Sequence, residues 1–96
     1  MDQPDPTIHQ PVRTRIMAAL NGLGSNEKID FVPLLALAKA TEGNLGSHIA
    51  TLEQAGYVAV EKVFEGKKPR TRLSLTKAGR KAFDTYIAYL REIIDE

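Results

Sequence analysis

Apolar residues in the first half of the chain recur at intervals of three and four, which is the period of an α-helix. A first helix is predicted to begin at Pro11, a residue that suits the first turn, and to stop at Gly22. After a turn, residues 28–31 can form a very short strand. Asp30 is then placed to cap a second helix, predicted from residue 31 to about 39.

A third helix follows almost without a break, since only one residue and a cap separate it from the second. Thr41 supplies the cap, and Gly56 ends the helix in the left-handed conformation that glycine favours. Beyond it, residues 57–64 and 71–76 alternate between apolar and polar on either side of a turn at residues 65–70. This pattern predicts a β-hairpin.

The end of the chain returns to helical spacing and predicts one long helix, from about residue 76 to 95. Two helices joined by a minimal turn and followed by a basic hairpin describe a winged helix-turn-helix. The predicted fold class is therefore mainly α with a small β-hairpin (α+β). Residues 1–7 hold two prolines and several turn formers, and we expect them to be a flexible arm. Residues 8–96 then form a single winged-helix domain that includes the long last helix.

The third helix, residues 41–55, has two contrasting faces. Leu45, Ile49 and Leu52 cluster on one side and are predicted to face the core. The opposite side is small, polar and uncharged, consisting of Gly43, Asn44, Ser47, Ala50, Thr51 and Gln54. A solvated helix face is normally rich in Lys, Glu and Arg, whereas small polar residues allow close approach and hydrogen bonds to base edges or phosphates. This face therefore predicts a helix that lies in a DNA major groove.

Two glycines lie in the opening turns of that helix, where each costs about 1 kcal/mol relative to alanine. Gly43 is central on the outward face, which favours close approach to DNA. Gly46 lies nearer the core edge, where a tight crossing with the second helix explains it equally well. His48 is equally suited to the edge of the core and to a contact with a phosphate or base.

The net charge of +1 is uninformative, but its distribution is uneven. Seven of the 13 basic residues lie between positions 67 and 81, and no acidic residue interrupts them. Lys67, Lys68 and Arg70 belong to the predicted hairpin turn, with Arg72 just behind. The stretch suits an anionic partner and a solvated charged surface about equally.

Apolar residues of the last helix form two adjacent stripes, which cover more surface than one small domain needs for docking. Burial against a second copy of the chain is the economical explanation, and coverage by the first helix is the alternative. We therefore predict a homodimer whose interface contains Tyr86, Tyr89, Leu90, Ile93 and Ile94.

The composition argues against several other classes of protein. The chain has no cysteine and only two histidines, no apolar run of membrane-spanning length, and an acidic, proline-rich start unlike a signal peptide. It contains no plausible catalytic triad, phosphate-binding loop or dinucleotide fingerprint. We expect a cytoplasmic protein without enzymatic activity, metal or cofactor.

A family resemblance is carried by the segment "DFVPLLALAKATEGNLGSHIATLEQAGYVAVEKVFEGKKPRTRLSLTKAGRKAFDTYI". It resembles the compact winged-helix regulators of the MarR and ArsR type, over about residues 11–94. The resemblance implies a homodimeric bacterial or archaeal repressor or activator, with Asn44, Ser47, His48 and Thr51 as reading positions. It also implies that Lys67, Lys68 and Arg70 lie at the tip of the wing.

The chain departs from this family type in two respects. ArsR-type metal sensors carry cysteines, or Asp and His ligands on the last helix; this chain has no cysteine and no histidine after His48, which argues against metal sensing. MarR-type proteins often have extra helices that build an effector pocket, so an effector for this short chain is left open.

The predicted function is sequence-specific binding of double-stranded DNA, at a palindromic operator, by a homodimer that regulates transcription. Residues 41–55 would read the major groove, with Thr41, Gly43, Asn44, Ser47, His48 and Thr51 as contacts. The basic wing at residues 65–72 would bind the backbone or minor groove through Lys67, Lys68, Arg70 and Arg72. The alternative is a winged-helix module that binds another protein and has no sequence-specific DNA binding.

Overall fold

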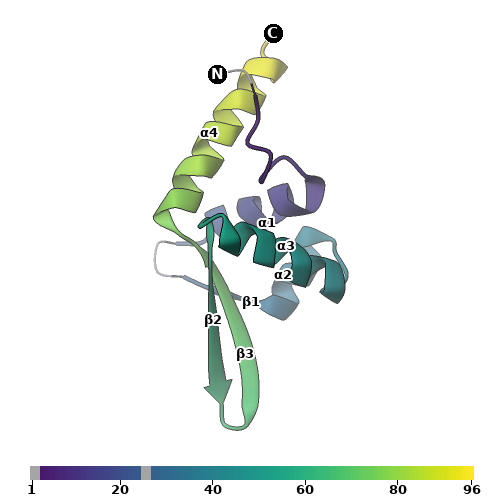
Figure 1. Cartoon of the computed structure of the whole chain (residues 1–96), viewed down its shortest axis with the longest axis vertical. Coiled ribbons are helices and arrows are strands. Elements are labelled where there is room, and N and C mark those ends of the chain that lie inside the picture. Colours follow the sequence, from purple (N-terminus) through teal and green to yellow (C-terminus); the bar gives the residue numbers. More distant parts are fainter. Residues whose placement is uncertain (1–2, 25–26) are drawn as a thin grey trace.

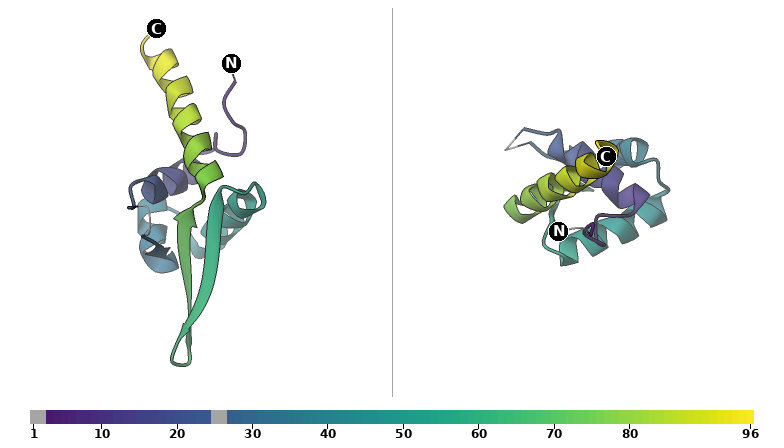
Figure 2. Two further views of the ribbon diagram at one scale, coloured as in Figure 1. Left: turned by 90° about the vertical axis from the view of Figure 1, so that its left-hand side faces the viewer. Right: turned by 90° about the horizontal axis from the view of Figure 1, so that it is seen from above.

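The computed structural model describes residues 3–24 and 27–96, which form four helices and a three-stranded antiparallel sheet. In chain order the elements are α1 (Pro11–Asn21), β1 (Ile29–Asp30), α2 (Phe31–Ala38), α3 (Glu42–Gln54), β2 (Val58–Glu65), β3 (Lys68–Leu75) and α4 (Lys77–Ile94). The first three helices lie together in the middle, and the β2–β3 hairpin and α4 project from opposite ends (Figures 1 and 2). The predicted winged helix-turn-helix is confirmed.

Side chains cap the starts of three helices. Gln10, Thr41 and Thr76 each precede a helix and accept a hydrogen bond from the backbone N–H three residues ahead. The predicted cap at Thr41 is confirmed. The predicted cap at Asp30 is wrong, because its side chain makes no such bond to α2 and binds Arg70 of β3 instead.

Two left-handed residues set the turns around α3. Lys39 has φ of 55° between α2 and α3, where its backbone N–H donates to the last turn of α2. Arg15 of α1 also binds the end of α2, since its Nε donates to the carbonyl of Ala38 at 2.7 Å. Gly56 has φ of 83°, which confirms the left-handed residue predicted after the third helix.

The sheet joins the short first strand to the hairpin in the order β1–β3–β2. Ile29 of β1 pairs with Leu73 of β3, which also pairs with Val60 of β2. The strand at residues 28–31 was predicted, and the structure adds its partner. Because β1 runs straight into α2, this pairing attaches the base of the hairpin to the helix-turn-helix.

One hydrophobic core connects the helices and the sheet. The predicted inward residues Leu45, Ile49 and Leu52 of α3 are all buried. They join Ile8, Ile16, Met17, Leu20, Leu34, Ala38, Val58, Leu73, Phe83 and Tyr86. The core occupies one side of α3, so the other side of that helix is left on the surface.

The start of α4 is fixed against the turn that follows α3. The hydroxyl of Thr76 donates to the carbonyl of Gly56 at 2.6 Å, and its backbone N–H donates to the carbonyl of Tyr57 at 3.1 Å. Gly79 lies directly over this turn, where a Cβ would overlap with the carbonyl oxygen of Tyr57. Only glycine allows so close an approach.

The segment before α1 makes defined contacts in its described part. Asp5 accepts a hydrogen bond of 2.5 Å from the hydroxyl of Tyr57, and Ile8 is fully buried. The Nε of Arg13 donates to the carbonyl of Thr7 at 2.6 Å. The arm predicted at residues 1–7 therefore lies against the domain from residue 3 onward.

Among the described residues, no helix is both long and apolar enough to cross a membrane.

Candidate nucleic-acid interface

The outward face of α3 is a continuous exposed surface of small polar residues. The positions predicted there, Thr41, Gly43, Asn44, Ser47 and Thr51, are all exposed. The hydroxyl of Thr51 donates to the carbonyl of Ser47 at 3.2 Å, which turns its lone pairs outward as acceptors. The face therefore offers amide and hydroxyl groups and no net charge of its own.

The two glycines of α3 have no partner within the described protein. A Cβ added to Gly43 or Gly46 would have no described heavy atom within 4 Å, apart from immediate neighbours and the helix's own backbone. A tight crossing with α2 therefore does not explain Gly46, and that alternative is wrong. Both glycines leave the helix backbone open to an external surface.

His48 lies at the edge of this face, half-buried between α3 and α1. Its Nδ1 is 3.1 Å from a guanidinium nitrogen of Arg13. Because arginine can only donate, Nδ1 accepts and the ring proton of the neutral form is on Nε2. Burial, and next the charge of Arg13, lower the pKa of His48 below 6.5. The neutral form of the ring therefore predominates at pH 7, with an N–H donor on its other nitrogen.

The predicted wing residues fall into two groups. Lys67 and Lys68 are exposed at the hairpin tip, beside Gly66 with its φ of 66°. Arg70, in contrast, does not extend from the tip as predicted. Its Nε donates to Asp30 at 3.0 Å, and its guanidinium also pairs with Glu65.

Arg72 shares the same carboxylate as Arg70. Its Nε lies 3.8 Å from the second oxygen of Asp30, so one acidic side chain holds two arginines of β3. These bonds connect the stalk of the wing, the part of the hairpin that holds Arg70 and Arg72, to the β1–α2 junction. Asp30 was not predicted as part of the interface, and only the β1–β3 pairing brings it there.

A shallow groove of about 300 Å³ separates α3 from the hairpin. Gly46 and Ala50 line one side, and Val60, Lys62 and Thr71 line the other. Lys62 was not among the predicted interface residues. The alternation of β2 could have identified it, since it lies on the same strand face as Val58 and Val60.

The predicted residues of α4 also differ in their surroundings. Tyr86 is buried, and its hydroxyl forms a hydrogen bond of 2.9 Å with Nδ1 of His9. It therefore belongs to the core of the protomer, which corrects its assignment to the predicted interface. Ile93 and Ile94 are 47% and 78% exposed, so α1 does not cover them as the alternative required.

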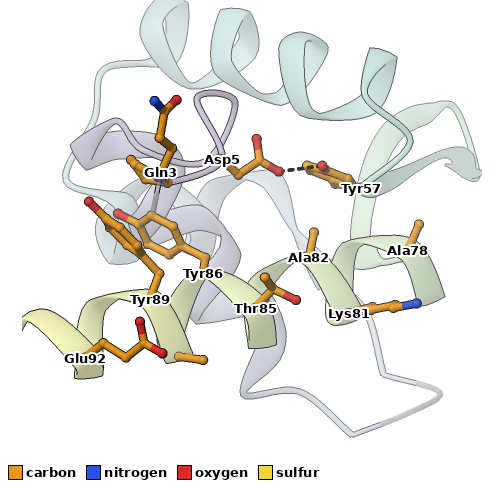
Figure 3. A pocket seen from close by; sticks show the side chains of 12 residues that line it. Gln3, Asp5, Tyr57, Ala78, Lys81, Ala82, Thr85, Tyr86, Tyr89 and Glu92 are labelled. Carbon is orange, nitrogen blue, oxygen red and sulfur yellow. Dashed lines mark hydrogen bonds between the residues drawn. The ribbon is translucent and has the colours of Figure 1, made fainter. Parts of the chain in front are cut away.

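Beside the half-buried Tyr89 a second groove, of about 520 Å³, runs between α4 and the N-terminal segment (Figure 3). The sticks place Tyr86 and Tyr89 next to Gln3, and Asp5, beside Gln3, is bonded to Tyr57 across from Ala82. The bond to Asp5, together with burial and the charge of that carboxylate, raises the pKa of Tyr57 to about 12.

Among the described residues, no three His, Cys, Asp or Glu side chains are grouped as metal ligands.

Known proteins resemble this chain in sequence and in structure. A family model described as a winged helix DNA-binding domain matches residues 12–94. An uncharacterised protein of Methanocaldococcus jannaschii is 37% identical over 76 residues, which are 79% of each chain.

Solved structures agree with the family match. A transcriptional regulator homologue from Pyrococcus horikoshii has a TM-score of 0.81 at 32% identity, over 93% of this chain and 85% of that one. A MarR-family regulator from Silicibacter pomeroyi has a TM-score of 0.70 at 22% identity, over 90% of this chain and 55% of that one, and supports the fold alone. With its polar outward helix and its basic hairpin tip, the chain belongs to the winged helix DNA-binding domain family.

Proposed function

We propose that the protein is a homodimeric transcriptional regulator that binds a palindromic operator in double-stranded DNA in the cytoplasm. The outward face of α3 is the observation that carries this proposal. It is exposed and uncharged at its centre, and Gly43 and Gly46 leave its backbone unobstructed. A helix with those properties can enter a major groove and bring short polar side chains to base edges.

In this proposal α3 determines which DNA sequence the protein recognises. Asn44 is the best candidate for a bidentate base contact, because its amide both donates and accepts. Ser47 and Thr51 contact bases or phosphates from the following turns. His48 offers its Nε2–H from the edge of the face, in an orientation that Arg13 holds.

The wing supplies affinity. Lys67 and Lys68 at the exposed tip bind phosphates or enter the minor groove. Arg70 and Arg72, which are paired with Asp30, contribute by holding the hairpin at a constant angle to α3. A phosphate that approaches the stalk can still attract both arginines, because each side chain remains at least one-third exposed.

The dimer forms through the distal half of α4, where Tyr89, Leu90, Ile93 and Ile94 provide apolar surface. That half projects beyond the three central helices, with the N-terminal segment along one side of it (Figure 1), so a second copy can reach its other sides. Two linked copies would present two α3 helices to successive half-sites of a palindrome. A role in transcription is supported by the Pyrococcus horikoshii relative, whose length this chain largely covers.

One observation favours a different role. Val32 and Leu37 of α2 are 71% and 54% exposed, and exposed apolar surface of this kind can mark a site for another protein. The second candidate is therefore a winged-helix module that binds a protein partner. Its anchor would be α2, while the polar face of α3 would have no assigned role.

Selection of bound sequences from a pool of random duplexes tests the proposal. We expect enrichment of one palindromic motif, with half-sites about one helical turn apart. The control is the same selection with the Gly43→Leu variant, which should enrich nothing. If the wild-type protein is dimeric at low salt and still enriches no motif, the protein-binding module becomes the better explanation.

A further inference from the structure

The wing carries an unusual aromatic side chain close to its tip. Phe64 is 74% exposed, and it is the only aromatic residue among the described large apolar side chains that are strongly exposed. Burial of a phenylalanine in water-excluded surroundings is favourable, so an exposed ring at the end of a projecting hairpin needs an explanation.

Strand register places Phe64 on the side of the hairpin that faces α3. It pairs with Pro69, and two residues further back Lys62 pairs with Thr71. Directly opposed residues share one face of a sheet, and so do residues two apart on a strand. Lys62 and Thr71 line the groove beside α3, so Phe64 and Pro69 continue that same face to the tip.

The surroundings of the ring carry positive charge. Lys62, Lys67 and Lys68 are exposed, and within residues 3–24 and 27–96 none of them forms an ion pair. Lys62 shares the face of Phe64, whereas Lys68 is the strand partner of Glu65 and lies on the opposite face. The two glutamates of β2 are already engaged, Glu65 with Arg70 and Glu61 with Lys28. Lys62 on the same face and Lys67 in the adjoining turn therefore place unpaired positive charge before and after the ring along the hairpin. Such a ring is complementary to a surface that is anionic outside and apolar within.

We propose that Phe64, with Pro69 opposite, is an apolar wedge that enters the DNA minor groove beside the half-site read by α3. This inference rests on the proposed DNA-binding function. The ring partly unstacks one base step and kinks the duplex, while the neighbouring lysines bind the flanking phosphates. Pyrimidine–purine steps unstack most readily, so the operator should prefer such a step at that position.

A wedge and a phosphate contact respond differently to salt. Removal of a lysine that binds a phosphate flattens the dependence of affinity on salt, because fewer counterions are released. Removal of an uncharged ring lowers affinity equally at every salt concentration. The wedge should also change the shape of the DNA, which the lysines alone need not do.

The test compares Phe64→Thr with Val63→Thr on the selected operator. Both variants place a β-branched residue in the same strand, but Val63 lies on the opposite face of the hairpin. Affinity is measured at several salt concentrations, and bending is followed by energy transfer between dyes at the two duplex ends. Circular dichroism and thermal unfolding confirm that each variant is folded.

We expect Phe64→Thr to weaken binding about tenfold, with an unchanged salt slope and a longer end-to-end distance of the bound duplex. Phe64→Leu should retain most of the bend, since leucine also acts as a wedge. Val63→Thr should match the wild type. Normal binding and bending by Phe64→Thr, or an equal loss in Val63→Thr, would overturn the wedge. If the wild-type protein binds no duplex at all, the proposed function itself fails.

Discussion

Arg13 of α1 donates a hydrogen bond to Nδ1 of His48 on α3, across 3.1 Å. The contact joins the candidate reading helix to the helix behind it. It also sets the state of the ring, because protonation would place a second positive charge next to the guanidinium.

The stability of the domain should therefore depend on His48 in mildly acidic solution. The pKa of His48 is below 6.5 in the folded protein, so the unfolded chain binds the proton more readily. The contribution of neutral His48 to the free energy of unfolding should be complete above about pH 6.5. It should be lost as the pH falls through the pKa of His48 in the folded protein. Urea unfolding at about pH 7.5 and pH 5.5 measures this loss, and His48→Gln should reduce it. An equal loss in wild type and variant would assign the pH dependence to other groups.

Gly43 should tolerate a side chain in the fold but not on DNA. Gly43→Ala places its Cβ in open space and should stabilise the protein by up to about 1 kcal/mol. Gly43→Leu should fold equally well and lose operator binding, because its bulk holds the helix away from the groove. Gly79→Ala provides the contrast and should destabilise by about 1–3 kcal/mol, since its Cβ meets the backbone of Tyr57. Urea unfolding and DNA titration separate the two effects; a Gly43→Leu variant that binds normally would exclude close approach at this position.

Sequence choice should depend on the polar residues of α3. Asn44→Ala or Ser47→Ala should cost about 1–3 kcal/mol on the selected operator if the side chain makes a good base contact. Binding to a scrambled duplex should change little. Titrations of both duplexes at one salt concentration make the comparison. Equal losses on the two duplexes would identify the residue as a phosphate contact.

The distal half of α4 should hold the two copies together. Tyr89→Asp or Ile93→Asp would bury an unpaired charge in the interface and should produce a monomer. Leu37→Asp, which replaces an exposed apolar residue of α2, should remain dimeric. Sedimentation reports the oligomeric state, and operator affinity should fall with the dimer because two half-sites are no longer linked. Dimers of both α4 variants would place the interface elsewhere.

The two tip lysines should contribute through counterion release. Replacement of Lys67 and Lys68 by alanine should flatten the slope of log affinity against log salt by about 2–4 units, if the lysines of both subunits engage. Preference among sequences should hardly change, because an ammonium group on a phosphate carries little base information. Salt titrations on the operator and on a scrambled duplex provide the measurement. An unchanged slope would mean that the tip does not touch DNA.

Local signals in the sequence predicted most of the elements. Thr41 caps a helix through a neighbour three residues away, and Gly56 ends it through its own backbone conformation. Leu45 and Leu52 share a face because of helical geometry alone. Each of these features depends on a few adjacent residues, so a single sequence contains the necessary information.

The contacts that the sequence did not reveal join distant residues. Asp30 and Arg70 are 40 positions apart, and they meet only because β1 pairs with β3. Tyr86 looked like an interface residue because it lies in an apolar stripe. Its partner His9, 77 positions away, shows that the core already uses this ring. Periodicity identifies an apolar face but does not identify what covers it.

The single residue between β3 and α4 has a consequence for the operator. Thr76 connects the wing directly to the helix proposed for dimerisation. Its hydroxyl also donates a hydrogen bond to the carbonyl of Gly56, in the turn after α3. A change in the crossing angle of two paired α4 helices would therefore carry each wing and each reading helix with it as one body. The dimer would then hold its two reading helices at a fixed separation and would bind only half-sites with the matching spacing. Inserting about half a helical turn of DNA at the centre of the palindrome would place one half-site on the far side of the duplex, beyond the reach of the second copy.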